Sequence, residues 1–190
     1  MAPGDASWSA TRGSRTATGS VRPWRAVAVG LVTLLALTGC TAEAAPSAGP
    51  SLIGTRTQLC ADRVEAAAAN AVIAGPVADL RELSTFTGSA RVGQCALLDN
   101  DGGALLSVQV VRDVGAKALS AELEKLSQQD NYSGDDASGV TGEGVTTTAL
   151  AAVDANYYVR VLGLGGISQD QRTAALALAK AVATVTASIQ

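Results

Sequence analysis

Two stretches of the chain alternate apolar and polar side chains with the period of a β-strand. Residues 104–112 carry leucine or valine at every second position with serine and glutamine between them, which predicts a strand with one buried face. Residues 93–98 precede this strand across the polar, glycine-rich turn 99–103, a strong turn signal. Residues 145–152 and 157–164 repeat the arrangement across a short Asp-Ala-Asn turn. The sequence therefore predicts two antiparallel hairpins.

Three further stretches place apolar residues at helical spacing. Residues 59–74 are alanine-rich and end at a Gly-Pro pair, and residues 115–129 carry a stripe of leucines. The last helix begins at Ser168, where Gln171 completes a capping box, and its apolar stripe reaches residue 189. The order α-ββα-ββα predicts an α+β fold, with an antiparallel sheet of about four strands packed against helices.

Two segments show neither period. Residues 77–88 are ambiguous and could hold a short helical turn near residues 78–83. Residues 130–144 are polar and rich in glycine, which is typical of an exposed loop.

The N-terminal region indicates export. Four arginines precede the apolar run 26–37, which is shorter than the roughly 20 residues that span a bilayer and typical of a signal-peptide core. An ordinary secretory peptide and an uncleaved anchor are the alternatives. Leu37-Thr38-Gly39-Cys40 resembles a bacterial lipobox, which implies cleavage before Cys40 and attachment of lipid, including palmitate, to its thiol. Because residues 1–20 make a long polar leader, Val21 is a candidate for the true initiator in place of Met1.

These features predict three parts. Residues 1–39 form a lipoprotein-type signal peptide, residues 40–55 a disordered, lipidated tether, and residues 56–190 a single α+β domain. The expected location is the extracytoplasmic face of the cell membrane.

The composition restricts the classes of partner that the protein is expected to bind. Removing the four arginines and Asp5 of residues 1–39 from the 14 basic and 17 acidic residues leaves 10 and 16, a net charge of −6. This charge argues against nucleic acid as a partner. Both tryptophans, Trp8 and Trp24, precede Cys40, so the remaining chain has few aromatic platforms for bases or sugar rings.

Cys60 and Cys95 remain once Cys40 carries lipid. An even pair in an oxidising compartment predicts a disulfide. Cys60 lies on the apolar stripe of the predicted first helix and Cys95 in the first strand, so the bridge is expected to join helix to sheet. The alternative, a redox-active or metal-binding pair, is disfavoured because the chain has no CxxC and no histidine.

The sequence offers few candidate residues for catalysis or for binding a cofactor or metal. The absence of histidine excludes a Ser-His-Asp triad. The glycine-rich stretch 163–166 lacks the third glycine of a dinucleotide loop, and the turn 99–103 lacks the closing glutamate of a calcium loop. Asp130, Asp135, Asp136 and Glu143 share one loop and are interpreted as solvated. We therefore expect no enzyme, and assign no catalytic, cofactor-binding or metal residue.

The combination of a lipobox, a short tether, two cysteines with Cys95-Ala96-Leu97-Leu98 opening a hairpin, and a final amphipathic helix resembles the small exported lipoproteins of actinobacteria. It is similar in particular to a broad family of uncharacterised function related to the PsbP-like α/β fold. The resemblance covers roughly residues 56–190 and implies no catalytic residues.

The expected function is that of a membrane-anchored, non-enzymatic binding module. A lipid, a cell-wall fragment or an envelope protein would bind in the groove between the sheet and the helices. The alternative is an accessory or sensor subunit that acts by protein contact through residues 130–144.

Overall fold

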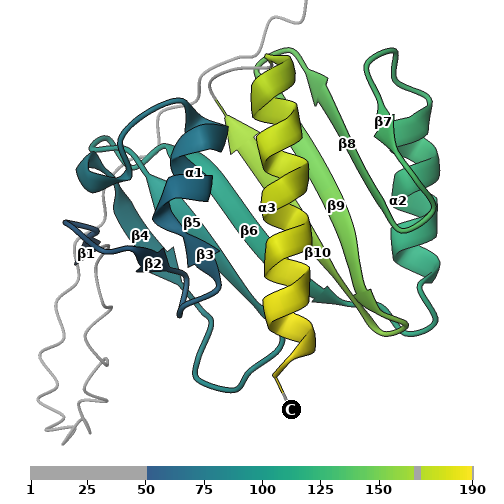
Figure 1. Ribbon diagram of the computed structural model, residues 1–190, viewed down its shortest axis with the longest axis horizontal. Coiled ribbons are helices and arrows are strands. Elements are labelled where there is room, and N and C mark those ends of the chain that lie inside the picture. The colour runs from purple at the N-terminus through teal and green to yellow at the C-terminus, as the bar shows by residue number, and fades with distance from the viewer. Residues whose placement is uncertain (1–50, 165–167, 190) are drawn as a thin grey trace, which may run out of the picture. The chain divides into compact units, whose positions relative to one another are not determined.

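The computed structural model describes residues 51–164 and 168–189 (Figure 1). Eight strands form an antiparallel sheet in the order β1-β4-β5-β6-β10-β9-β8-β7, and β2 pairs with β3 in a separate small hairpin. The strands are β1 (Ser51–Leu52), β2 (Gln58–Leu59), β3 (Val64–Glu65), β4 (Arg81–Ser84), β5 (Gly93–Leu98), β6 (Ala104–Arg112), β7 (Ser133–Gly134), β8 (Ser138–Glu143), β9 (Thr146–Asp154) and β10 (Tyr157–Leu164). The helices are α1 (Ala66–Ile73), α2 (Lys117–Ser127) and α3 (Gln169–Ala187), with a 3₁₀ turn η1 (Val77–Asp79).

The α+β class and both predicted hairpins are confirmed. β5 pairs with β6 and β9 pairs with β10, and β6 joins the two hairpins by pairing with β10. Val110 lies opposite Val159 and Val108 opposite Val161, so the alternating valines meet in the centre of the sheet.

The predicted sheet of about four strands is too small. β4 follows η1 inside the ambiguous segment 77–88, and β7 and β8 lie inside the predicted loop 130–144. Asn131 covers the free edge of β8, because its side-chain amide donates to the Gly142 carbonyl and accepts from the Gly142 N–H at 3.2 Å. A side chain thus takes the place of a neighbouring strand and blunts an exposed edge.

The helices cover the sheet unequally. α1 and α3 lie side by side on one face (Figure 1), and the main core lies between them and the sheet. α2 packs on the opposite face, where Leu119 and Leu123 meet Leu150 and Tyr158 in a smaller core. This cluster reaches Tyr158 of β10 and Val111 of β6, and among the described residues it includes none from β4 or β5.

The first helix begins later than the sequence predicts. Cys60, Ala61 and Asp62 have φ angles of 58°, 54° and 64°, a left-handed run that no α-helix contains. These residues form the turn between β2 and β3, closed by a 3.1 Å bond from the Arg63 N–H to the Leu59 carbonyl. Cys60 therefore lies in a turn, and the prediction that its disulfide joins a helix to the sheet is wrong.

The last helix follows the prediction closely. The Ser168 hydroxyl accepts from the Gln171 N–H, and the Gln171 side chain accepts from the Ser168 N–H, each at 3.2 Å. This reciprocal cap fixes the helix start.

The folded unit includes residues that the sequence analysis assigns to the tether. Ser51 and Leu52 pair with β4, and Ile53 is buried at 2% exposure. The predicted signal peptide, Cys40 and residues 41–50 lie outside the described residues. Among the described residues, no helix combines the length and apolar character that crossing a bilayer requires.

Candidate binding groove

Two hollows lie along one flank of α3. The first has a volume of about 460 Å³ and is lined by Asp135, Ala137, Ser138, Ala151, Ala152, Val153, Lys180, Ala183, Thr184 and Ala187. The second, of about 290 Å³, is lined by Asn131, Tyr132, Ser133, Val140, Gln169, Arg172, Thr173 and Leu176. The α3 residues of the two hollows follow one another at helical spacing, three or four residues apart. We call this flank, with its two hollows, the α3 groove.

The floor of the α3 groove is apolar and its rim is charged. Val140 and Ala151 are buried beneath it, and Lys180 borders the first hollow on α3 while Asp135 borders it from the β7–β8 turn. Arg172 borders the second hollow two helical turns earlier. An apolar floor with a few polar groups at its rim is the usual composition of a ligand site.

Asp135 is held rigidly at this rim. Its Oδ1 accepts hydrogen bonds from the Ala137 N–H at 2.9 Å, the Ser138 N–H at 2.7 Å and the Ser138 hydroxyl at 3.0 Å. These bonds, aided by the positive charge of Lys180, lower the pKa of the Asp135 carboxyl. The rim therefore keeps a fixed negative charge opposite a lysine at neutral pH.

Tyr132 separates the second hollow from the α2 side of the sheet. Its ring lies against two glycines, and a Cβ on Gly139 would sit 2.6 Å from the Tyr132 Cε2 atom. Burial, together with the negative charges of Asp135 and Asp136, raises the pKa of the Tyr132 hydroxyl. The phenol is therefore neutral and available as a hydrogen-bond donor or acceptor.

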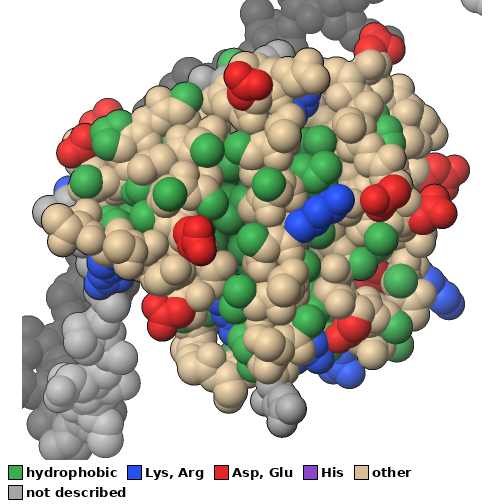
Figure 2. All heavy atoms as spheres, viewed as in Figure 1, with side chains coloured by type: hydrophobic (Ala, Val, Ile, Leu, Met, Phe, Trp, Pro, Cys, Tyr) green, Lys and Arg blue, Asp and Glu red, His purple; other side chains and the backbone are tan. Residues whose placement is uncertain are grey.

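The helix surface beside the α3 groove is nearly free of charge. α1 has no charged residue, and α3 has only Asp170, Arg172 and Lys180 in 19 residues. Figure 2 shows hydrophobic side chains gathered between α1 and α3, with few charged groups over them.

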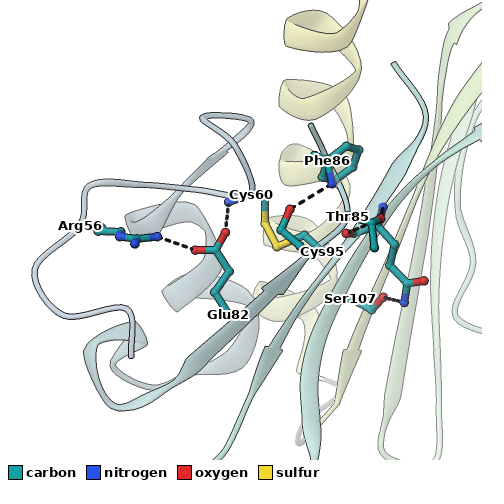
Figure 3. Close-up of a disulfide and its surroundings, with 9 residues drawn as sticks. Arg56, Cys60, Glu82, Thr85, Phe86, Cys95 and Ser107 are labelled. Atoms are coloured by element: carbon teal, nitrogen blue, oxygen red, sulfur yellow. Dashed lines mark hydrogen bonds and ion pairs between the residues drawn. A yellow bond between two sulfur atoms is a disulfide. The ribbon is translucent and has the colours of Figure 1, made fainter. Parts of the chain in front are cut away.

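The Cys60–Cys95 disulfide is present, with 5.5 Å between the Cα atoms. Glu82 reaches from β4 to the bridge, accepts a 2.8 Å hydrogen bond from the Cys60 N–H, and pairs with Arg56 at 3.2 Å (Figure 3). Cys60, Glu82 and Cys95 are the potential metal ligands that come together within the described residues. With both sulfurs in the bridge, neither offers a thiolate to a metal, so the arrangement is a clamp between the β2–β3 turn and the sheet.

A second clamp holds the far end of α3. Arg63, at 3% exposure, donates to the Ala90 carbonyl, and at 3.4 Å each to the Arg91 carbonyl and the Thr186 hydroxyl. Its guanidinium lies 4.4 Å from the centre of the Phe86 ring, a cation–π contact. Burial lowers the pKa of Arg63. The cation lies at the C-terminal end of α3, where the helix dipole favours positive charge.

A polar cluster beneath α2 centres on the Glu122 carboxylate. The Tyr158 hydroxyl donates to Glu122 at 2.9 Å, and Arg160 pairs with the same carboxylate oxygen. Burial, with the hydrogen bond to Glu122, raises the pKa of Tyr158 to about 12. A phenol with that pKa stays protonated at neutral pH, so it cannot act as a base. The cluster ties α2 to β10.

The carboxylates considered from the sequence lie at three places, and Asp130 and Glu143 line the same surface hollow. Asp99 closes the β5–β6 turn by accepting the N–H groups of Asp101 at 3.0 Å and Gly103 at 2.7 Å, as a hairpin turn requires. Asp135 and Asp136 lie at the β7–β8 turn, and Glu143 lies at the end of β8. The groove residues on α3 were missed because an alanine-rich helix face carries no binding signal in the sequence.

The chain matches no family model, and neither the curated proteins nor the solved structures contain a match to it.

Proposed function

We propose that this protein is a non-enzymatic binding module, anchored by lipid on Cys40 to the extracytoplasmic face of the cell membrane, whose α3 groove holds the ligand. The candidate ligands are a lipid, a cell-wall fragment and a segment of an envelope protein. The observation that carries the proposal is the groove itself, which combines an apolar floor with fixed charges at its rim. Membership of the actinobacterial lipoprotein family stays a prediction.

The anchor is supported by the sequence and agrees with the start of the fold. Ten residues separate Cys40 from Ser51, the first residue of β1, and ten residues reach at most about 35 Å. The Cys60–Cys95 disulfide is also of the kind that persists in exported proteins. Feeding cells labelled palmitate tests the anchor, since the wild type should take up label and a Cys40→Ser variant should not.

The non-enzymatic assignment follows from how the polar groups are used. Glu122, Asp135 and Glu82 each accept hydrogen bonds from neighbouring protein groups, and the chain has no histidine. These bonds give each of the three carboxylates a structural role, which supports the non-enzymatic proposal.

The test of the ligand site is native mass spectrometry of protein purified from its own membranes. We expect a bound mass on the wild-type protein. A Thr184→Trp variant, which fills the first hollow, should lose it. Ala181→Trp is the matched control, because Ala181 is exposed on the same helix and does not line a groove hollow. Wild-type protein that is always empty, or equal loss in both variants, would count against the α3 groove as a ligand site.

A further inference from the structure

The sheet face opposite α1 and α3 is left partly bare. α2 covers it where Leu119 and Leu123 pack on Leu150 and Tyr158, at the end of the sheet formed by β8, β9 and β10. Among the described residues, the cluster under α2 includes Val111 of β6 but no residue of β4 or β5.

Leucine and alanine side chains share the bare area with polar ones, since cross-strand pairing places Arg81 beside Leu98, and Gln94 and Gln109 beside one another on the same face. Because strand side chains alternate between faces, the neighbours of Cys95 and Leu97 in the main core point to the other side, whereas Leu105, at the register shift between β5 and β6, packs against the main core. Cross-strand pairing places Leu83 beside Ala96, Ala96 beside Ser107, and Ser107 beside Leu162. We call this surface the open sheet face; its apolar members are Leu83, Ala96, Leu98, Leu162 and Leu164.

The open sheet face exposes only a small apolar area. Leu83 and Leu164 are 40% and 37% exposed, whereas Leu98 is 8% exposed and the other members are half-buried. Polar groups lie within the face, where the Gln94 amide donates to the Ser107 hydroxyl at 3.3 Å between Ala96 and Leu162 (Figure 3). A stable dimer needs roughly 800 Å² from each partner, more than two partly exposed leucines with their half-buried neighbours provide.

The chain enters the sheet at its edge strand β1, beside the strands of the open sheet face. β1 is the neighbour of β4, which carries Leu83. The ten residues from Cys40 to β1 therefore hold Ser51, at the edge of the sheet beside β4, within about 35 Å of any bilayer to which Cys40 is anchored. Such a tether supplies an effective concentration of order millimolar, so a surface too weak to bind a membrane on its own can stay docked.

We propose that the open sheet face docks on the surface of the lipid bilayer, with Leu83 and Leu164 at the boundary between headgroups and acyl chains. This inference rests on the proposed lipid anchor. Docking is driven by apolar burial. It needs no anionic lipid, because Asp99 and Asp101 at the β5–β6 turn offset the charge of Arg81, which pairs with Leu98 on the same face. The α3 groove, on the other side of the sheet, then faces away from the membrane.

The chain suits a tryptophan reporter experiment. Trp8 and Trp24 both precede Cys40, so a chain beginning at Cys40 has no tryptophan of its own. Leu83→Trp places one reporter on the open sheet face. Val185→Trp is the matched control, since Val185 is 39% exposed and lies on α3, on the opposite side of the sheet. Leu164→Trp provides a second reporter if Leu83→Trp fails to fold.

The lipid-anchored variants are placed in phosphatidylcholine vesicles with brominated acyl chains. We expect the emission of Leu83→Trp to shift to shorter wavelength and to be quenched at least twofold, with Val185→Trp unaffected. Raising the salt concentration should not reverse the quenching. Equal quenching at both positions, or none at either, would overturn the docking. A blue shift of Leu83→Trp that grows with protein concentration without vesicles would overturn it in favour of a second copy.

A second arm separates failure of docking from failure of the anchor. The chain from Cys40 contains every described residue, and with Cys60 and Cys95 bridged, Cys40 is its single free thiol. Coupling this thiol to a maleimide lipid in the same vesicles supplies the anchor chemically. Quenching of Leu83→Trp in this arm supports docking even if cells attach no palmitate, and its absence overturns docking even if they do.

Discussion

Removal of the Cys60–Cys95 disulfide should lower the free energy of unfolding by about 4 kcal/mol. The bridge closes a loop of 35 residues, and the chain-entropy account gives about 3.8 kcal/mol for a loop of that length at 25 °C. Total stabilities of single domains are about 5–15 kcal/mol, so the bridge supplies a large share. For a domain of this size the loss corresponds to a fall in Tm of roughly 12 °C.

The assay is urea unfolding of a Cys60→Ala/Cys95→Ala variant followed by far-UV circular dichroism. Cys40→Ser is the control, because it keeps the bridge and should leave the unfolding free energy unchanged. The m-value should rise in the double variant, since an unbridged unfolded chain exposes more surface. A loss below about 1 kcal/mol with an unchanged m-value would refute the view that the bridge acts on the unfolded chain.

Three smaller predictions concern the backbone and one carboxylate. Ala74 ends α1 with φ 54°, so Ala74→Gly should stabilise by about 0.5–1 kcal/mol in thermal unfolding, whereas Ala71→Gly inside the helix should destabilise by a similar amount. A Cβ on Gly163 would lie 2.9 Å from the Val72 Cγ1 atom, so Gly163→Ala should cost about 1–3 kcal/mol, and adding Val72→Ala should recover part of the loss. Backbone hydrogen bonds from the start of α2 lower the pKa of Asp113 below 3.8. The charged Asp113 carboxylate therefore stabilises the fold above that pH, and this stabilisation is lost as the pH falls through the folded pKa. The Tm difference between wild type and Asp113→Asn should therefore shrink below pH 4, and a constant difference would contradict this assignment.

The parts of the fold that the sequence predicts are those where local pattern and tertiary burial agree. Apolar and polar residues alternate along β6 because one face of the strand lies in the main core. The start of α3 can be predicted because Ser168 and Gln171 form a capping box. In both cases the side chains that set the local structure are also the ones that the fold buries.

The missed elements have specific reasons. β8 reads Ser-Gly-Val-Thr-Gly-Glu and is buried on both faces, so it shows no alternation, and its glycines suggest a loop. Gly139 is required because the Tyr132 ring lies against it and leaves no room for a Cβ atom. The left-handed turn at Cys60 could not be predicted from the sequence either, because cysteine and alanine rarely adopt positive φ. An alanine-rich continuation then makes residues 59–74 look like one helix.

The proposed ligand site in the α3 groove and the proposed docking of the open sheet face together restrict the class of ligand. The α3 groove and the open sheet face lie on opposite sides of one sheet, because residues of the main core separate Lys180 and Thr184 from Leu83. If Leu83 rests on the bilayer, a membrane lipid would have to leave the bilayer and pass around the domain to reach the groove, which the apolar burial it would lose opposes. A cell-wall fragment or a protein segment meets the outward groove directly. We therefore expect native mass spectra to show a water-soluble ligand that Thr184→Trp displaces. A bound phospholipid that the same variant displaces would mean that the groove and the bilayer communicate, and the orientation argued from Leu83 would be wrong.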